Sequence, residues 1–460
     1  MKQARTMRVI WSFTCFLIVQ ISYGASEIHL GLADLTQAAL LNSDKLKSVN
    51  QQADGIDFKR KAIRSYALPQ FNIEGNYKYT TDLPTMTIPL GLTEREIQTG
   101  KHNAYFMGVS ANYLVTDFGA NSLQQDSMAK IKMAKDREKQ TLGQSLRLEV
   151  KTTFFKVMLN IEKMRLVLDS WRLSQAQHTE ISKHFKAGKA SQFDYLQSRK
   201  EALDYKSRFI EAQNNLSSDL GHLMRLSGKD TTHDPIILPI EKKMISLLPD
   251  DLERPQTIIS IDEHSFKKIN VDTILADAWS IDNPALQRLN SLREGHTLAK
   301  RSVTRAFLPK ISIYAKSGYE YPNGSKSEFH RQNIVGVNLT MPLWDGGLIM
   351  SNRGEKEAAI LEVSSEEMNL KKDLHFDLNN TLNNLKDLQR EHSVIGIGVN
   401  DVDQMSKLVY QSYRGGKSTI TDVLATNLKT LDWKVRLANI QTQILMQIAI
   451  LEYLSSRTIL

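Results

Sequence analysis

The residues of this chain that could carry chemistry stand in two similar stretches, 228 positions apart. The first runs from Phe185 to Leu196 and the second from Tyr413 to Leu424. Each contains, at the same spacing, a glycine, a lysine, a hydroxyl residue and an aspartate: Gly188, Lys189, Ser191 and Asp194, then Gly416, Lys417, Thr419 and Asp422. A hydroxyl residue followed three positions later by an acid is typical of a helix N-cap with a capping-box partner. The stretches therefore indicate charged, capped turns between helices.

The sequence contains no complete catalytic or cofactor-binding motif. Gly416-Lys417-Ser418 resembles the end of a phosphate-binding loop, but position 411 is Gln411 instead of glycine and no strand is expected before it. The 11 histidines show neither an HExxH motif nor paired ligand spacing, since His178 and His184 fall on different helix faces. We therefore expect that the protein is not an enzyme and binds neither a metal ion nor a cofactor.

Long helical segments position the two stretches. After Asp117-Phe118-Gly119 the helical period continues to Ala187, with a coiled-coil seam in its middle. The seam comprises Phe154, Val157, Ile161, Met164, Leu168 and Trp171. Such a helix would be roughly 100 Å long, whereas ordinary globular helices run about 8–20 residues. Gly188 is expected to end it in the left-handed conformation, and a second helix returns to about Leu226. Each stretch is thus predicted to be the tip of a helical hairpin.

Before each long helix the apolar period changes from 3.6 to 2. Alternating runs occupy Gln70 to Tyr79 and Phe106 to Thr116, and again Ile311 to Tyr321 and Val335 to Leu343. Runs of about 10 residues suit tilted strands that cross a membrane, although a strand pair in a soluble sandwich would have the same pattern. A polar loop containing Pro84 and Pro89 is expected between the first two runs.

The order of these elements predicts a tandem duplication. Residues 25–228 form the first repeat, with a β-hairpin at 70–116 and a helical tip near 188. Residues 229–270, broken by four prolines, form the linker. Residues 271–460 form the second repeat, with a β-hairpin at 311–344 and a tip near 416. Its β-hairpin loop is 12 residues shorter, because the offset between the repeats drops from 240 to 228.

Residues 1–24 have the pattern of a secretory signal peptide. The apolar run from Val9 to Ile21 is too short to span a bilayer as a helix, and small residues precede a cut ahead of Ala25. Cys15, the single cysteine, lies inside this run, so the mature chain would have no disulfide. Removing the three basic signal residues lowers the net charge from +8 to +5, a scattered surplus that argues against a nucleic-acid partner.

Four strands cannot close a membrane barrel, since common barrels have at least about eight. An open sheet edge is not tolerated in lipid, so a membrane-spanning sheet would have to pool strands from several copies of the chain. Two copies would supply eight strands and three would supply twelve. The long helices carry many charges and would have to project from the bilayer.

Together these residues resemble the TolC-like outer-membrane efflux channels over residues 30–455. The matching motifs are Leu68-Pro69, Leu308-Pro309, Asp117-x-Gly119, Pro342-Leu343-Trp344-Asp345-Gly346-Gly347 and the paired Gly-x-x-[Ser/Thr]-x-x-Asp tips. The resemblance implies a mainly α homotrimer with one twelve-stranded β-barrel in outer-membrane lipid and an α-helical tunnel in the periplasm. It also implies a periplasmic adaptor and an inner-membrane pump of the RND, ABC or MFS type. The expected function is the export of drugs and other toxic small molecules.

The resemblance also implies a periplasmic gate formed by Asp422, Ser418, Lys417 and Asp194. Three copies of Asp422 would form a carboxylate ring at the closed mouth, and such a ring attracts cations. The alternative is that Asp422 only caps its helix. Ser418 occupies a position where some members carry an arginine that locks the closed state, so Lys417 would have to serve as donor, or the gate is looser.

Gly188, Lys189, Gly416 and Lys417 would form the surface presented to the adaptor, the alternative being plain helix-ending turns. Tyrosines near the strand ends would form an interfacial girdle, or else pack in a core. Two other functions stay open at this point. One is the exit duct of a type I protein secretion system, and the other is a coiled-coil stalk or adhesin without a pore.

Overall fold

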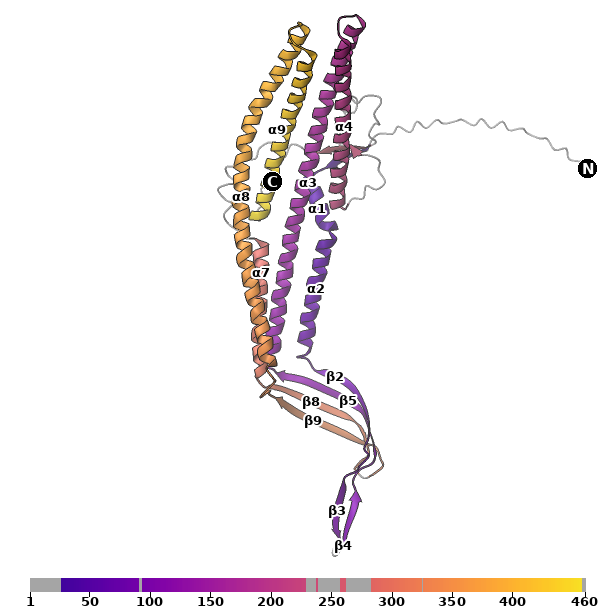
Figure 1. Cartoon of the computed structure of the whole chain (residues 1–460). Coiled ribbons are helices and arrows are strands. Elements are labelled where there is room, and N and C mark those ends of the chain that lie inside the picture. Colours follow the sequence, from indigo (N-terminus) through magenta and orange to yellow (C-terminus); the bar gives the residue numbers. More distant parts are fainter. Residues whose placement is uncertain are drawn as a thin grey trace, which may run out of the picture.

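The computed structural model describes residues 26–90, 93–228, 237–238, 257–261, 283–324 and 326–456. The predicted signal peptide, most of the predicted linker and positions 271–282 lie outside the described residues. The chain is elongated, with long helices at one end and a curved sheet at the other (Figure 1). No helix in the described ranges combines the length and apolarity that a membrane span requires.

Two shorter helices precede the first strand. α1 spans Leu32–Asn42 and α2 spans Asp44–Ser65, separated by Ser43. The Ser43 backbone is extended, and its hydroxyl accepts a hydrogen bond from the Leu46 N–H at 3.4 Å. This side chain therefore satisfies a free donor at the start of α2.

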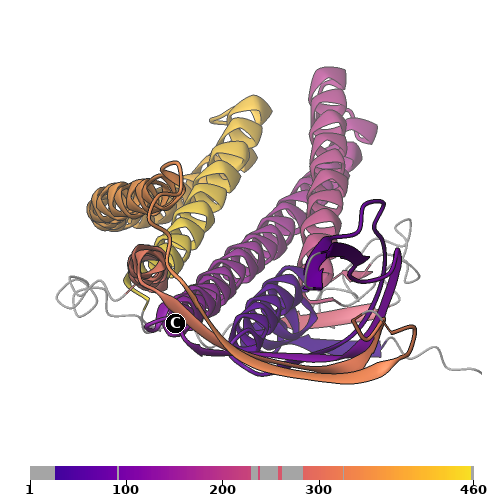
Figure 2. The same ribbon diagram turned by 90° about the horizontal axis from the view of Figure 1, so that it is seen from below.

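The predicted strands are present and form one antiparallel sheet. Its strands are β2 (Gln70–Tyr79), β5 (Asn103–Thr116), β8 (Lys310–Tyr321) and β9 (His330–Thr340), in the order β2-β5-β8-β9. The central pair, β5 and β8, joins the two halves of the chain. Within the described residues β2 and β9 each have one unpaired edge, and the sheet is strongly curved (Figure 2).

One sheet face carries exposed apolar side chains. Alternate residues of all four strands contribute to it: Phe71, Ile73, Tyr77, Tyr79, Met107, Val109, Tyr113, Val115, Ile313, Tyr319, Val335, Val337 and Leu339. The opposite face carries polar residues that include Glu74 and Lys316, whose side chains form an ion pair at 3.5 Å. An apolar face of this size exposed to water would be unfavourable, so the sheet requires an apolar environment on that side.

The loop expected between β2 and β5 is partly regular. β3 (Thr85–Leu90) and β4 (Thr93–Gln98) pair as an antiparallel ribbon, so the expectation of an irregular loop was wrong. Met86 and Ile88 alternate with Thr85 and Thr87, a period-two pattern that favours a strand. Pro89 is tolerated because each strand of an isolated ribbon has a free edge.

A second small sheet was not expected. β1 (Ser26–Leu30) pairs in parallel with β7 (Thr257–Ile261), which also pairs in parallel with β6 (Ile237–Leu238). β6 and β7 lie within the predicted linker, so part of that segment is paired with the start of the described chain. Pairing over such a distance leaves no local sequence pattern.

The long helices have the predicted bounds within a few residues. α3 (Ala120–Lys186) and α4 (Gln192–Leu226) form one hairpin, and α8 (Leu348–Arg414) and α9 (Ile420–Ser455) form the other. α3 and α8 each contain 67 residues. α7 (Pro284–Thr304) continues into a short 3-10 turn, η2 (Arg305–Phe307), and packs against α3 and α8.

α3 and α8 begin with the same cap. In each an aspartate accepts two backbone N–H bonds: Asp117 at 3.0 and 2.7 Å, and Asp345 at 3.0 and 2.8 Å. The residue before each helix is a glycine with positive φ, 83° at Gly119 and 87° at Gly347. Only glycine adopts this backbone at little cost, which explains its presence after both second strands.

The main core lies where α3 packs on α4. Its members are fully or almost fully buried: Phe154, Phe155, Met164, Leu168, Trp171, Tyr205, Phe209, Leu216 and Leu223. Residues of α1 and α9 belong to the same cluster, so this core joins the first half of the chain to the second. This confirms the predicted apolar seam.

In the second hairpin a glycine permits close packing of α8 on α9. A β-carbon at Gly398 would lie 2.1 Å from the Trp433 ring, whereas one at Gly396 would meet nothing within 4 Å. The indole of Trp433 therefore lies directly against the α8 backbone at Gly398. This contact explains a glycine that the helical period alone does not.

Candidate functional site

The two hairpin tips have the same backbone. Gly188 and Gly416 both have φ of 70°, just past the ends of α3 and α8. The Lys189 and Lys417 N–H groups each donate back to the preceding helix at 2.8 Å, which satisfies free carbonyls at its end. The predicted left-handed glycine turns are confirmed.

Both predicted capping boxes are present. The Ser191 hydroxyl accepts from the Asp194 N–H at 3.1 Å, and the Asp194 carboxylate accepts from the Ser191 N–H at 3.3 Å. The equivalent distances for Thr419 and Asp422 are 3.2 and 2.9 Å. Both tip acids therefore cap their helices.

A cleft lies between the two tips, beside the point where the hairpins touch. It is lined from the first hairpin by Gln177, Glu180, Ile181, His184, Lys189, Ala190 and Asp194, and from the second hairpin by Tyr410, Tyr413, Arg414, Gly416 and Ser418. The structure thus brings together Lys189, Asp194, Gly416 and Ser418. Gly188, Lys417 and Asp422 are not among its lining residues.

Apolar residues pack beside this cleft. Ile181 of α3 meets Ile420, Val423 and Leu424 of α9, all four buried. The two hairpins therefore contact each other at their tips through a small core. This apolar patch is small and buries little surface, so its contribution to stability is limited. Polar contacts between the two hairpins also hold the tips together.

An acid on α3 is bonded to two side chains of α8. The Glu180 carboxylate accepts from the Tyr410 hydroxyl at 2.5 Å and forms an ion pair with Arg414, with Nε at 3.6 Å. Burial, followed by the bond to Glu180, raises the pKa of Tyr410 to about 12, so the phenol keeps its proton at neutral pH. This link joins the two hairpins about two helical turns from the tips.

Glu180, Tyr410 and Arg414 were not singled out in the sequence. The available signal was the spacing of Tyr410 and Arg414, four residues apart and hence on one face of α8. Arg414 forms its ion pair with Glu180 across the two hairpins. Ser418 instead donates to the Val409 carbonyl at 3.3 Å, and in the described part of the chain Lys417 has no carboxylate partner.

Asp422 is exposed at the second tip. Its carboxylate accepts from the Thr419 hydroxyl at 2.7 Å as well as from the Thr419 N–H. These two bonds, the hydroxyl first, hold the pKa of Asp422 below its usual value. The carboxylate is therefore charged at neutral pH and available to solvent.

Farther from the tips, a buried polar chain crosses three helices. The Asn427 amide donates to Gln177 at 3.0 Å, and the Ser406 hydroxyl donates to Asn427 at 3.0 Å. Gln177 lies on α3, Asn427 on α9 and Ser406 on α8. Because buried amides are costly when unpaired, this chain favours one alignment of the two hairpins.

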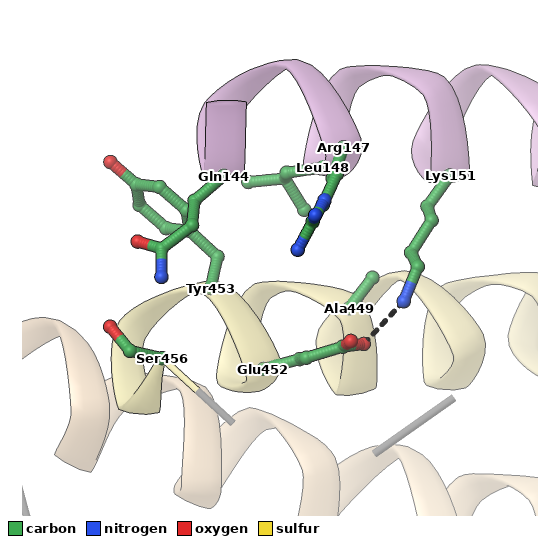
Figure 3. Close-up of a pocket in the computed structure, with 8 residues that line it drawn as sticks. All are labelled: Gln144, Arg147, Leu148, Lys151, Ala449, Glu452, Tyr453 and Ser456. Atoms are coloured by element: carbon green, nitrogen blue, oxygen red, sulfur yellow. Dashed lines mark hydrogen bonds and ion pairs between the residues drawn. The ribbon is translucent and has the colours of Figure 1, made fainter. Parts of the chain in front are cut away.

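A second junction lies where α9 ends against α3 (Figure 3). Lys151 and Glu452 form an ion pair at 2.6 Å, with side chains only 10% and 14% exposed. The small pocket beside them is also lined by Arg147, Tyr453 and Ser456. Among the described residues no cluster of three or more histidine, cysteine or acidic side chains could hold a metal ion.

Aromatic rings gather at the end of the sheet farthest from the helices. Tyr77 lies 5.1 Å from Tyr105, Tyr105 lies 5.8 Å from Tyr321, and Tyr321 lies 5.1 Å from Phe329. Tyr77, Tyr105 and Tyr321 belong to the apolar face by strand register. This row matches the expected position of interfacial aromatics.

The sequence is similar to known outer-membrane proteins. The model of the family described as outer membrane efflux protein matches residues 35–229. The outer membrane protein TolC of Escherichia coli (strain K12) is 19% identical over 418 residues, covering 89% of this chain and 78% of the relative. TolC of Salmonella enteritidis is 20% identical over 422 residues, with the same coverage of both chains.

Solved structures of outer-membrane channels have the same fold. The channel OprN aligns over 93% of this chain and 90% of its own, with 14% identity and a TM-score of 0.70. CmeC of Campylobacter jejuni aligns over 92% and 85%, with 16% identity and a TM-score of 0.69. The open state of MtrE from Neisseria gonorrhoeae covers 93% and 89%, with 14% identity and a TM-score of 0.68. At these identities the likeness shows the fold.

Proposed function

We propose that this chain is an outer-membrane channel of the outer membrane efflux protein family and that it exports toxic small molecules as part of a tripartite efflux system. The match of the family model to residues 35–229 and the similarity to TolC and OprN support this proposal. Its β-sheet lies in the outer membrane, and its helices form a tunnel in the periplasm. The carrying observation is the sheet, which combines an exposed apolar face with two free edges at the end of long charged helices.

The sheet supports a closed barrel made from several chains. Lipid satisfies the apolar face, but an unpaired strand edge in lipid leaves backbone groups without partners. If β9 of one copy pairs with β2 of the next, no edge remains. Three copies give twelve strands, a number that leaves an interior wider than an eight-stranded barrel.

Two exposed apolar stripes support the same ring in the helices. α4 exposes Phe193, Leu196, Leu203 and Ile210, and α8 exposes Val394, Ile397, Met405 and Leu408. Ile210 stands 22 residues after Gly188 and Val394 stands 22 residues before Gly416, so both stripes cover the same height above the tips. α4 and α8 lie on opposite edges of the molecule in both views (Figures 1 and 2).

Such a pair of different surfaces on opposite edges makes a head-to-tail contact, which closes into a ring. In this ring the α4 stripe of one copy packs against the α8 stripe of the next. The proposal includes that three copies of the chain form the ring and that the chain itself is a tandem duplication. The duplication is supported by the matching caps and the equal lengths of α3 and α8.

The hairpin tips form the periplasmic entrance. The link from Glu180 to Tyr410 and Arg414 holds the second hairpin against the first, and three copies of Asp422 present negative charge there. The adaptor docks on the exposed tips, which include Gly188, Lys189, Gly416 and Lys417. The inner-membrane pump supplies the substrate.

Membrane fractionation tests the architecture. We expect the protein in the outer-membrane fraction, released only by detergent, and as an oligomer on an unboiled gel that becomes a monomer on boiling. A monomer extracted without detergent would sink the channel assignment. A deletion strain should become sensitive to toxic compounds, whereas a loss confined to a secreted protein would instead identify a secretion duct.

Conductance in planar bilayers tests the entrance. Tyr410→Phe removes the hydroxyl bonded to Glu180 and should raise the conductance of the resting channel, while Tyr413→Phe serves as control. Asp422→Asn keeps an oxygen that can accept the capping bonds but removes the charge, so the preference for cations should fall. Asp194→Asn, the equivalent change in the first hairpin, should alter it less. Unchanged conductance and selectivity would reject this entrance.

A further inference from the structure

We propose that the β3–β4 ribbon is a contact surface between copies of this chain and narrows the outer mouth of the barrel. Its apolar face, formed by Met86, Ile88 and Ile97, packs against the same face of neighbouring ribbons. The inference rests on the proposed ring of copies. It adds a contact beyond the membrane, on the side opposite the helices.

The ribbon is held to the sheet by a defined bend. Beyond the last pair of β2 and β5, the Thr80 N–H donates to the His102 carbonyl at 2.8 Å. The chain then turns at Gly100, whose φ is 105°. Pairing resumes at once, because the Thr99 N–H and hydroxyl both donate to the Pro84 carbonyl, at 2.7 and 2.9 Å. The hairpin therefore continues through a bend, which sets the direction of the ribbon.

The ribbon has two unlike faces. Met86 pairs with Ile97 across the strands, and Ile88, two residues along, lies on the same face, with Arg95 as its cross-strand partner. Thr85, Thr87 and Glu96 belong to the other face. Met86, Ile88 and Ile97 are all exposed in a single chain, Met86 by 56%. A two-stranded ribbon is marginally stable alone, so burying this apolar face against a partner would stabilise it.

The position of the ribbon favours a second copy as that partner. Figure 2 shows it over the hollow side of the curved sheet, which is the interior side of any barrel built from this sheet. Lipid lies on the outer side and cannot reach a ribbon placed there. The neighbours over the mouth are therefore the ribbons of the other copies.

The small area of the apolar face of the ribbon also favours a second copy of the chain as its partner. Three side chains make an apolar area far smaller than the roughly 1,000 Å² that a specific interface between free proteins needs. Copies already held in a ring meet at roughly millimolar effective concentration, so a weak patch is sufficient between them. The other hairpin, β8–β9, has only the short connection 322–329, so each copy contributes one ribbon.

Cysteine cross-linking in outer-membrane preparations tests the contact. Met86→Cys places a thiol on the apolar face, and Thr87→Cys places one next to it on the opposite face. After mild oxidation, a non-reducing boiled gel should show at least tenfold more cross-linked dimer for Met86→Cys. Equal cross-linking of the two variants, or none in either, would overturn the contact.

A second variant tests the narrowing without introducing thiols. Residues 85–98 are replaced by a short turn, so that the first β-hairpin resembles the second. The unboiled gel should still show the oligomer, and single-channel conductance should rise above that of the unaltered protein. An intact oligomer with unchanged conductance would overturn the narrowing alone. Absence of an oligomer in the unaltered protein would overturn the channel proposal itself.

Discussion

The first helical hairpin (α3–α4) and the second (α8–α9) share their frame and differ in their packing. Both begin with an aspartate–glycine cap, rise for 67 residues and turn at a left-handed glycine followed by a capping box. The first buries Phe154, Trp171 and Phe209 between its helices. In the second, no aromatic residue of α8 within the described chain is buried, and many apolar residues face outward.

This difference teaches that backbone signals and side-chain packing serve separate purposes. The caps and glycines set where each helix begins and ends, so both hairpins reach the same height. The side chains decide what each hairpin packs against. The aromatic residues of α3 are buried within one copy, whereas the exposed apolar residues of α4 and α8 pack against neighbouring copies in the proposed ring.

The largest expected effect is on the buried aromatic residues of α3, which α8 lacks within the described chain. Phe154→Ala should lower the free energy of unfolding by about 3–5 kcal/mol, because Phe154 is fully buried. Leu382 occupies the equivalent position on α8 and is 7% exposed, so Leu382→Ala should cost about 2–3 kcal/mol. Thermal unfolding followed by circular dichroism measures both. Equal losses would remove the contrast between the two cores.

The ion pair between the halves comes next. Glu452→Gln should cost about 2–4 kcal/mol, because it leaves Lys151 charged and mostly buried. Replacing both residues by apolar ones of similar size, Lys151→Met with Glu452→Leu, should recover much of that loss. If the single and double variants unfold at the same temperature, the pair does not bind the second hairpin to the first.

A glycine pair sharpens the comparison within α8. Gly398→Ala should destabilise the α8–α9 packing by about 1–3 kcal/mol, because the new methyl group would overlap the Trp433 ring. Gly396→Ala, two residues away, has free space and should be neutral or stabilise the helix by up to about 1 kcal/mol. Indole fluorescence should shift for the first variant alone, and a shift in both would contradict direct packing on Gly398.

The N-caps of α4 and α9 should contribute equally to stability. Ser191→Ala and Thr419→Ala each remove the hydroxyl that accepts an N–H at the start of a returning helix. Each should cost about 0.5–2 kcal/mol, and the two values should agree closely. Limited proteolysis at the tips provides the measurement, and a clearly larger effect at one tip would show that the tips are not equivalent.

The smallest expected effect is a pH dependence at the second tip. Because the folded pKa of Asp422 is lowered, its stabilising contribution is complete above the unfolded pKa and is lost as pH falls through the folded pKa. Asp422→Asn should reduce the slope of stability against pH between about pH 5 and about pH 3. An unchanged slope would show that the bonds from Thr419 do not stabilise the charged form.

Local signals predicted most of the frame from sequence. The tip glycines and both capping boxes follow from residue types at fixed spacing, and the strands follow from alternation. The link from Glu180 to Tyr410 and Arg414 could not be predicted the same way, because it joins residues about 230 positions apart. The parallel pairing of β1 with β7 is similarly remote. The ribbon was missed because its prolines outweighed a short alternating pattern.

The equal lengths of α3 and α8 restrict how this protein can change. Each residue inserted into an α-helix lengthens it by about 1.5 Å and rotates the remainder of the helix by about 100°. An insertion in α3 or in α8 alone would therefore shift Glu180 away from Tyr410 in both height and direction. We expect relatives with a longer or shorter tunnel to carry matching insertions or deletions in both α3 and α8, with lengths close to whole helical turns.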